Sequence, residues 1–469
     1  MRRACLLAAG LGLLGSYAFA CSTGSEETQH GPVFDESDSG VESGVRDATA
    51  SDAARDGGAT RDVDSGVDAP AAVDAFVPED AIASQDVGAD APAMGDDAGV
   101  DAAMGIDAAP DAGVDAATGI DAAGCTSSFA ILEGNATSVL AQAWSAGTWG
   151  SPTSFSGSGV SLASPPALVA AFGGFLGAFE ETGAKLTYTR WSGGTWTPLA
   201  QVAGALTKGP PSLAATSSGV AHVVYWGTDD KYYHGTYDAT TALWDGASDP
   251  VGGAATQLFG PSGPSMASPA AGSLVVAQAG SDSNVYAESW QTSWAATPAK
   301  VTATPSAQNS TSPRVVALSG AASDALIVFA RLTDDVLMYS VRSGGTWSAP
   351  AVLRDTTTFT AYQVALSPLA SGGAMLVYQG GDQKGYFSTF SPASATPWTA
   401  PLPIVSTNNP ALASPPVVAP GVCGGEALAV LAPTIGEAQL MSFEGGAWTV
   451  FDSLAGSTGT TFAAVATIP

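Results

Sequence analysis

The side chains best suited to bind a ligand lie in one short stretch of the chain. It holds one tryptophan, two carboxylates and two polar rings: Trp226, Asp229, Asp230, Tyr232 and His234. An aromatic face beside carboxylates suits a sugar, whose CH-rich face stacks on the ring while its hydroxyls hydrogen-bond to the carboxylates. The five residues are therefore candidate carbohydrate-binding residues. The alternative is an exposed hairpin with scattered aromatics.

Motifs for catalysis or for a metal are absent from the sequence. It contains no G-x-S-x-G elbow, no H-E-x-x-H and no phosphate-cradling glycine loop. His222 falls in one predicted strand and His234 in the next. This placement does not indicate a metal centre. We therefore predict that the protein is not an enzyme and holds neither a metal nor a cofactor.

A tryptophan after a short turn recurs seven times. The seven are Trp149, Trp196, Trp244, Trp294, Trp347, Trp398 and Trp448, separated by 47, 48, 50, 53, 51 and 50 residues. Between them lie short apolar runs bounded by Gly, Pro, Ser and Asp, without helical periodicity, which indicates β-structure. A period near 50 in such a chain is typical of propeller blades of four antiparallel strands.

The two ends of the repeat region predict how the ring closes. The first unit begins at "SSFAILEG" and has room for three strands before Trp149, whereas the chain ends in one more apolar strand, "TTFAAVATIP". We therefore predict an all-β, seven-bladed propeller over 125–469. Its C-terminal strand joins the N-terminal blade and leaves no unpaired edge.

The repeated aromatics have a structural explanation, because an aromatic at the end of one strand pairs with the tryptophan that opens the next. Residues that break the repeat are better candidates for function. The end of the second predicted strand carries different side chains in different units: Glu180, Trp226, Gln278, Arg331 and Gln379. Arg331 joins the candidate ligand-binding residues on this basis.

The blade length and stretches such as "DDVLMYSVRSGGTWSAP" resemble the lectin-like β-propellers, namely the fucose-specific lectin family and its seven-bladed relatives. The resemblance implies a carbohydrate-binding ring with pockets between blades, each lined by an arginine, a glutamate and aromatics. This chain departs from the pattern, since Arg190, Arg331 and Arg342 do not recur at one blade position. A full ring of equivalent fucose pockets is therefore not expected, and one or two sites stay open.

The stretch "SGGTW", at 192–196 and 343–347, also resembles a degenerate Asp-box, the hairpin signature of sialidases. Every copy lacks the aspartate. Sialidases bind a carboxylate through three clustered arginines, and the predicted propeller contains only five arginines. A degenerate sialidase-like glycoside hydrolase is therefore the second alternative function.

The N-terminal part differs in composition. Residues 1–20 predict a signal peptide, with two arginines before a short apolar run. Residues 21–124 hold 24 of the 43 acidic residues and no tryptophan or tyrosine, so they predict a disordered acidic spacer. Cys21 follows the expected cleavage point and resembles the acylated cysteine of bacterial lipoproteins. Simple secretion after Ala20 is the alternative.

Two cysteines remain for the exported protein. Cys125 falls at the predicted seam of the ring, and Cys423 falls just after the first strand of the last blade. An even pair in an exported chain suggests a disulfide. We predict that this disulfide clasps the seam.

Together these features predict an exported, lipid-anchored, surface-displayed binding module on the outer membrane or cell surface. Glycans are the expected partners, and cell-envelope or surface proteins are the alternative, as for an adhesion scaffold. Only the N-terminal lipid is expected to contact a membrane, and we expect a monomer. Nucleic acid is not expected, because 19 acidic and 10 basic residues follow the spacer.

Overall fold

The computed structural model describes the chain within residues 127–468. Short internal gaps in that description fall at 136, 156–159, 217–219, 252–262, 271, 302–310, 320–323, 355–359, 361, 406–408, 455–456 and 458. Four features predicted from the sequence lie outside the described residues: the signal peptide, the acidic spacer, the lipid site at Cys21 and Cys125, the partner of Cys423 in the predicted disulfide. They stay predictions.

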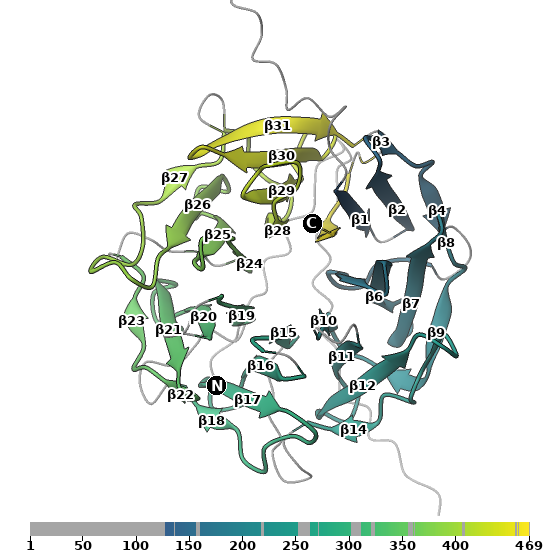
Figure 1. Ribbon diagram of the computed structural model, residues 1–469, viewed down its shortest axis with the longest axis horizontal. Coiled ribbons are helices and arrows are strands. Elements are labelled where there is room, and N and C mark those ends of the chain that lie inside the picture. The colour runs from purple at the N-terminus through teal and green to yellow at the C-terminus, as the bar shows by residue number, and fades with distance from the viewer. Residues whose placement is uncertain are drawn as a thin grey trace, which may run out of the picture. The chain divides into compact units, whose positions relative to one another are not determined.

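The described chain forms seven antiparallel sheets arranged as the blades of a ring (Figure 1). Blade 1 contains β32 (Phe462–Ile468), β1 (Ser128–Asn135), β2 (Ser138–Ser145), β3 (Thr148–Trp149) and β4 (Thr153–Phe155). Blade 2 contains β5 (Ala167–Ala171), β6 (Gly174–Glu181), β7 (Lys185–Ser192), β8 (Thr195–Trp196) and β9 (Ala200–Leu206). Blade 3 contains β10 (Ser212–Ala215), β11 (Ala221–Trp226), β12 (Tyr232–Asp238), β13 (Leu243–Trp244) and β14 (Asp249–Pro250).

The remaining four blades follow the same plan. Blade 4 contains β15 (Ser265–Ala267), β16 (Leu274–Ala279), β17 (Val285–Trp290) and β18 (Ala299–Lys300). Blade 5 contains β19 (Arg314–Ala317), β20 (Ala325–Ala330), β21 (Leu337–Ser343), β22 (Thr346–Trp347) and β23 (Ala351–Val352). Blade 6 contains β24 (Ala365–Pro368), β25 (Ala374–Gln379), β26 (Gly385–Phe390) and β27 (Leu402–Pro403). Blade 7 contains β28 (Val417–Pro420), β29 (Ala427–Leu431), β30 (Gln439–Glu444) and β31 (Ala447–Ser453). The predicted seven-bladed propeller is confirmed.

The ring closes through the first blade, as predicted. β1 pairs with β2 on one side and with the C-terminal strand β32 on the other, so that Ile131 lies opposite both Gln142 and Val465. This shared sheet leaves β1 with no free edge and joins the two ends of the folded chain by main-chain hydrogen bonds. Cys423 packs against the apolar cluster at this seam. The predicted disulfide stays a prediction because Cys125 is not described.

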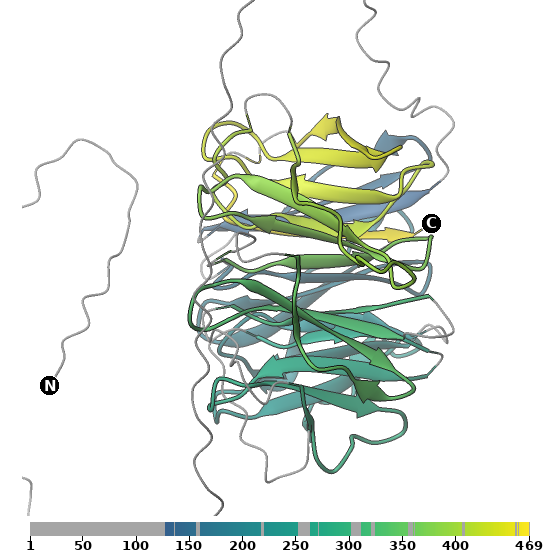
Figure 2. The same cartoon turned by 90° about the vertical axis from the view of Figure 1, so that its left-hand side faces the viewer.

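The innermost strand of every blade lines the middle of the ring. Each of these strands contacts the innermost strands of the two neighbouring blades, in the order β32, β5, β10, β15, β19, β24, β28 and back to β32. In side view the strands run roughly along the axis of the ring (Figure 2). Most of the inner strands follow proline in the sequence, as in "SPPALVAA" and "GPPSLAA", and proline is tolerated where a strand begins.

The repeated tryptophans stabilise the hairpin between the third and fourth strands. Trp144 pairs with Trp149, Trp191 with Trp196, and Phe443 with Trp448. The two turn glycines of "SGGTW" adopt positive φ angles, 60° at Gly193, which only glycine adopts at little cost. The tryptophan motif is therefore a structural feature of the blade, as predicted.

The apolar core lies between blades. Alternate residues of each strand face opposite neighbours, as the two-residue period of a strand requires. In β11, Ala221, Val223 and Tyr225 pack toward blade 2, whereas Val224 and Trp226 pack toward blade 4. The residues described include no helix that is long and apolar enough to cross a membrane.

Candidate functional site

A hairpin motif with the pattern G-x-D-x-x-x-Y recurs between the second and third strands of blades 3, 4 and 6. In sequence order its three copies are Gly227, Asp229 and Tyr233; Gly280, Asp282 and Tyr286; and Gly380, Asp382 and Tyr386. In every copy the tyrosine hydroxyl donates a hydrogen bond to the aspartate Oδ2, with O···O distances of 2.6, 2.8 and 2.9 Å. We call these three groups the Asp–Tyr hairpins.

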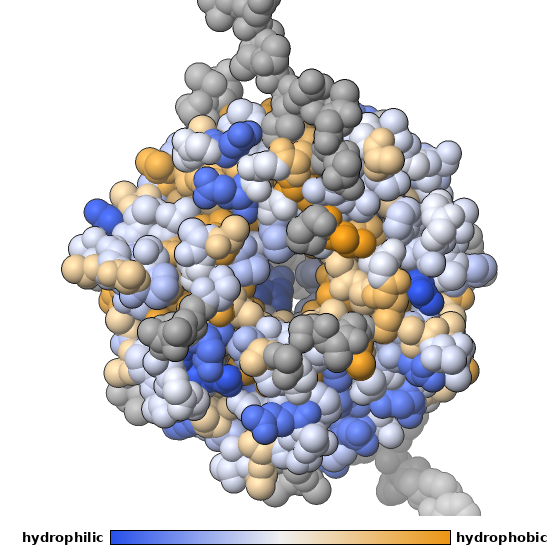
Figure 3. All heavy atoms as spheres, in the orientation of Figure 1, coloured by the Kyte–Doolittle hydropathy of each residue, from blue (hydrophilic) through white to orange (hydrophobic). Residues whose placement is uncertain are grey.

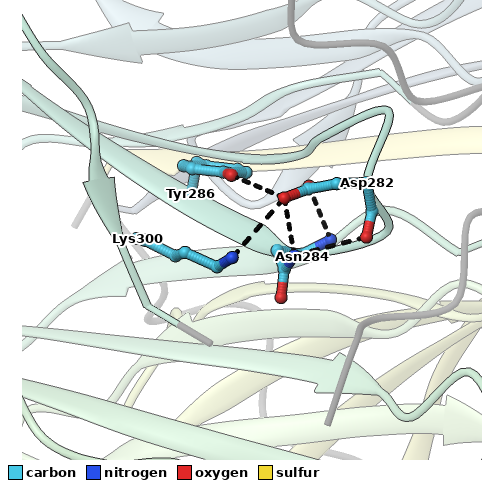
Figure 4. Close-up of polar contacts among 4 residues, drawn as sticks. All are labelled: Asp282, Asn284, Tyr286 and Lys300. Atoms are coloured by element: carbon cyan, nitrogen blue, oxygen red, sulfur yellow. Dashed lines mark hydrogen bonds and ion pairs between the residues drawn. The ribbon is translucent and has the colours of Figure 1, made fainter. Parts of the chain in front are cut away.

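The same aspartates also organise the turn itself. In blade 4, Asp282 Oδ1 accepts a hydrogen bond from the Asn284 backbone N–H at 3.1 Å, and Asp282 Oδ2 accepts one from the Asn284 side chain at 2.7 Å (Figure 4). The glycine is required by close packing, since a Cβ on Gly280 would lie 2.6 Å from the Tyr286 ring. Local turn chemistry therefore positions the carboxylate and the phenol together.

A lysine accompanies each Asp–Tyr hairpin. The Nζ–Oδ2 distance is 3.6 Å for Lys231 and Asp229, and 3.5 Å for Lys300 and Asp282. It is 4.0 Å in the third copy, between Lys384 and Asp382. All six side chains are 39–47 % exposed. Each hairpin thus presents an exposed anion, an exposed cation and an aromatic hydroxyl, which are hydrogen-bonding groups of the kind that bind polyhydroxylated ligands.

The protonation states follow from these contacts. Partial burial raises the pKa of Asp282, but the hydrogen bonds from Tyr286 and Asn284 outweigh it and hold the pKa below its usual value. Burial and the hydrogen bond to Asp282 together raise the pKa of Tyr286. At neutral pH the aspartate is therefore an ionised acceptor and the tyrosine a neutral donor.

The hairpin of blade 3 borders a pocket between blades 2 and 3. The pocket has a volume of about 340 Å³ and is lined by Tyr225, Tyr233, Asp229, Ser248 and Leu206, together with small residues. The rings of Tyr225 and Tyr233 are stacked, with centroids 5.6 Å apart and an interplanar angle of 26°. The Tyr225 hydroxyl donates to the Ala247 carbonyl at 2.7 Å, which fixes this ring. The pocket combines a rigid aromatic pair with a half-exposed carboxylate.

Trp226 and Asp230, two residues named from the sequence, lie beside Lys208. The Lys208 ammonium lies 5.2 Å from the centroid of the Trp226 ring and forms an ion pair with Asp230. A cation at that distance over an indole is a cation–π contact. Lys208 and Glu180 also line a neighbouring hollow of about 330 Å³ near the middle of the ring. Trp226 and Asp230 are therefore brought together, and Asp229 instead joins Tyr233.

Tyr232 and His234 do not lie in a surface site. They are 2 % and 3 % exposed, because every second residue of β12 points between blades 3 and 4. Tyr232 packs there in an apolar cluster with Val224 and Val276. The expectation that these two residues would reach a ligand at an exposed hairpin is corrected.

His222 and His234, which the sequence places on successive strands, are in direct contact. His222 Nδ1 lies 3.0 Å from His234 Nε2, and the rings are stacked. They lie on adjacent strands, β11 and β12, and face the same side of the sheet. The residues that the structure describes contain no group of three or more His, Cys, Asp or Glu side chains that could hold a metal ion.

Arg331 occupies the hairpin of blade 5, where other blades have the glycine of the Asp–Tyr hairpin. Its guanidinium donates two hydrogen bonds to the Asp334 carboxylate, at 2.7 and 2.5 Å. The hydrogen bonds to Asp334 raise the pKa of Arg331. Arg331 therefore holds its own turn together and does not join the Asp–Tyr hairpins.

The tyrosines of the Asp–Tyr hairpins were not among the site residues named from the sequence. The pattern G-x-D-x-x-x-Y, present three times, is the signal that identifies them.

Comparisons with known proteins identify similar solved structures but no family for this chain. No protein-family model and no curated protein matches the chain. Among solved structures, AofleA from Arthrobotrys oligospora is similar with a TM-score of 0.42 at 13% identity, over 64% of this chain and 88% of that one. A protein of unknown function from Dyadobacter fermentans has a TM-score of 0.41 at 12% identity, over 61% and 92%.

A lectin from Aleuria aurantia has a TM-score of 0.39 at 15% identity, over 62% of this chain and 95% of that one. It is described as a six-bladed β-propeller with a novel mode of fucose recognition. Likeness at this level carries no argument about the ligand of the present chain, which forms a ring of seven blades rather than six.

Proposed function

We propose that the propeller is a carbohydrate-binding module and that its partners are glycans. The observation that carries the proposal is the pocket between blades 2 and 3, where Asp229 stands beside the stacked rings of Tyr225 and Tyr233. A sugar ring offers a CH-rich face to the aromatic pair and hydroxyl donors to the carboxylate. The Tyr233–Asp229 hydrogen bond holds these groups in place before a ligand arrives.

Blades 4 and 6 repeat the Asp–Tyr–Lys arrangement, which suits a ligand with several similar sugars. Linked weak sites raise the effective concentration of the second binding event, so avidity exceeds the affinity of one site by orders of magnitude. The proposal therefore favours extended or densely displayed glycans over free monosaccharides.

The proposal includes export and display at the cell surface. The sequence-predicted signal peptide over 1–20, acylation site at Cys21 and acidic spacer over 21–124 motivate it, because a disordered spacer of ~100 residues would have an end-to-end distance of roughly 55 Å. A surface module of this kind captures glycans outside the cell. A protein-interaction scaffold and a degenerate glycoside hydrolase are the alternative functions.

A glycan array probed with the full chain tests the proposal. We expect binding that Asp229→Asn weakens roughly 10- to 100-fold, as for loss of a hydrogen bond to a charged group. Trp226→Ala tests the adjacent patch; unchanged affinity removes Trp226 from the site. Glu444→Gln, which neutralises an exposed carboxylate on blade 7, is the matched control and should bind as the wild type does.

Three results contradict parts of the proposal. Absence of binding to any glycan, with capture of a defined envelope protein, favours the scaffold. Equal weakening by Asp229→Asn and Glu444→Gln means that general charge, not the pocket, sets the affinity. Turnover of a fluorogenic glycoside that is lost in a carboxylate variant shows an enzyme.

A further inference from the structure

The middle of the ring contains a second kind of site, distinct from the Asp–Tyr hairpins. One mouth of the central hollow has a volume of about 220 Å³ and is lined by the first residues of the inner strands. Figure 3 shows the hollow at the centre of the ring, with hydrophobic residues along one side of it. The volume accommodates a small organic molecule rather than a single water.

Arg314 is the only residue with a formal charge among the described residues that line this mouth. It is the first residue of β19 and directly follows a proline. At the same position the other Pro-led inner strands carry small or aliphatic residues, namely Ala167, Ser212, Ser265 and Val417. Arg314 therefore breaks the repeat at a position that faces the common cavity of all seven blades.

The guanidinium of Arg314 has little compensation from the protein. Its Nε donates to the Val364 carbonyl at 3.2 Å. None of the ion pairs among the described residues includes Arg314. Burial lowers the pKa of Arg314 to about 10, so the group is charged at neutral pH. A half-buried cation without a carboxylate partner attracts an anion more strongly than a fully exposed cation does.

Two other arginines have a carboxylate partner. Arg331 pairs with Asp334, and Arg342 pairs with Asp324 through Nε at 2.8 Å. In the adjoining hollow, which shares Pro165, Pro210, Gln363 and Phe462 with the mouth, Lys208 is paired with Asp230. Arg190 and Arg354 also lack a carboxylate partner among the described residues, but neither lines the central mouth. Arg314 is thus set apart by its position in the mouth together with the lack of such a partner.

The walls around Arg314 indicate what kind of anion fits. They combine proline pairs and aliphatic side chains, such as Pro165-Pro166 and Pro415-Pro416, with hydroxyl groups of Ser212, Ser265, Ser414 and Thr461. Gln363 adds an amide beside Val364. The single cation balances one negative charge; a doubly charged phosphate would leave one charge without a cationic partner.

We propose that the central hollow binds a small monocarboxylate with an apolar body, with Arg314 holding the carboxylate. The fork of N–H groups on a guanidinium matches the two oxygens of a carboxylate. Gln363 lies within the same mouth to hydrogen-bond the ligand, and the proline walls cover its apolar part. This site neither requires nor excludes glycan binding by the Asp–Tyr hairpins.

Fluorine NMR of 4-fluorobenzoate with the full chain tests the proposal. We expect saturable line broadening, and we expect Arg314→Gln to raise the dissociation constant at least tenfold. Arg314→Lys should have a dissociation constant between those of the wild type and Arg314→Gln, because lysine keeps the charge and loses the bidentate geometry. Arg331→Gln removes the same charge from a hairpin paired with Asp334 and should leave the dissociation constant unchanged. Far-UV circular dichroism and the thermal midpoint confirm that each variant is folded.

Competition in the wild-type protein supplies a test that needs no variant. Unlabelled benzoate should displace the probe, whereas benzamide, which has the same shape without the charge, should not. Displacement by benzamide, or an unchanged dissociation constant in folded Arg314→Gln, overturns the proposal. Displacement by inorganic phosphate at the same concentration as benzoate shows a general anion site and overturns the choice of a monocarboxylate. If Arg314→Gln does not fold, absence of saturable binding to the wild type overturns it equally.

Discussion

The imidazole rings of His222 and His234 lie stacked in the core, with His222 Nδ1 3.0 Å from His234 Nε2. Trp290 of the next blade covers both, with ring centroids at 4.9 and 5.5 Å. Burial lowers the pKa of both histidines to about 4, and the neighbouring His234 lowers that of His222 further. Both rings are therefore neutral at pH 7, and one donates its N–H to the other.

We predict that this pair makes the fold sensitive to mild acid. Unfolded histidines bind protons below about pH 6.5, whereas the folded pair does so only near pH 4, so stability is complete above 6.5 and falls as pH drops toward 4. Between pH 7.5 and 5.0 the loss is roughly 2 kcal/mol for each histidine. Urea unfolding of the wild type and of a His222→Gln/His234→Gln variant at both pH values measures it.

The comparison between variant and wild type isolates the histidines, because the carboxyl groups titrate equally in both proteins. The variant should lose less stability on acidification than the wild type does. Proton NMR provides a second readout on the wild type. Titration midpoints near 6.5 for both His222 and His234 in the folded protein would show that the pair is not buried in this way.

Glu288 should have the opposite pH dependence. It is 1 % exposed, and neither carboxylate oxygen has a hydrogen-bond partner among the described residues. Burial raises its pKa from 4.5 to about 8, so its contribution to stability is present below 4.5 and is lost as pH rises through 8. The free energy of unfolding of Glu288→Gln relative to that of the wild type should therefore rise by roughly 3 kcal/mol when the pH is raised from 5 to 8.

Chemical denaturation at the two pH values checks the Glu288 prediction. The exposed Glu444→Gln serves as control, since it removes a carboxyl group that is not buried. A Glu288→Gln variant whose stability relative to wild type does not change with pH contradicts the prediction.

The glycine of the Asp–Tyr hairpin should be intolerant of a side chain. In Gly280→Ala the new Cβ would lie 2.6 Å from the Tyr286 ring, so the ring must move and its 2.8 Å hydrogen bond to Asp282 must lengthen. We expect a loss of about 1–3 kcal/mol, typical of overpacking. Gly209→Ala is the matched control, because its Cβ meets Trp226 at an ordinary 3.7 Å. Equal thermal midpoints for the two variants would refute the packing role.

A disulfide between Cys125 and Cys423 should clasp the seam of the ring. Intact-mass spectrometry of the exported chain with and without reduction should show a gain of two hydrogens. Reduction should lower stability by about 2–4 kcal/mol, the usual range for a disulfide. Cys423→Ser should have the same stability with and without reductant. Alkylation of both cysteines without prior reduction would rule the disulfide out.

The order of strands could be predicted because each blade is encoded locally. Apolar runs of strand length, turn glycines such as Gly193 and a tryptophan every 50 or so residues repeat in one stretch of chain per blade. The closure by β32 followed from the count, since a three-stranded first unit needs one more strand. These features depend on neighbours in sequence, which a linear pattern records.

The placement of the candidate residues could be predicted in part. Asp229 falls on the exposed hairpin that was expected, because Asp and Gly at a turn are a local signal, whereas Trp226 ends β11 and is half-buried against blade 4. Tyr232 and His234 were misplaced, because two-residue alternation separates the two faces of a strand without showing that both are covered. In this propeller blade 4 covers the face of β12 that carries Tyr232 and His234, so these two side chains are buried.

By itself, the sequence determined seven blades, their strand order and the turns that join them, because hydrogen bonding within a blade is specified over about fifty residues. Only the tertiary structure decided which side chains meet across blades and around the axis. Trp290 covers His222 and His234, and Arg314 stands within the walls made by other inner strands. Such contacts depend on the rotation of one blade against the next, and no spacing along the chain encodes that rotation.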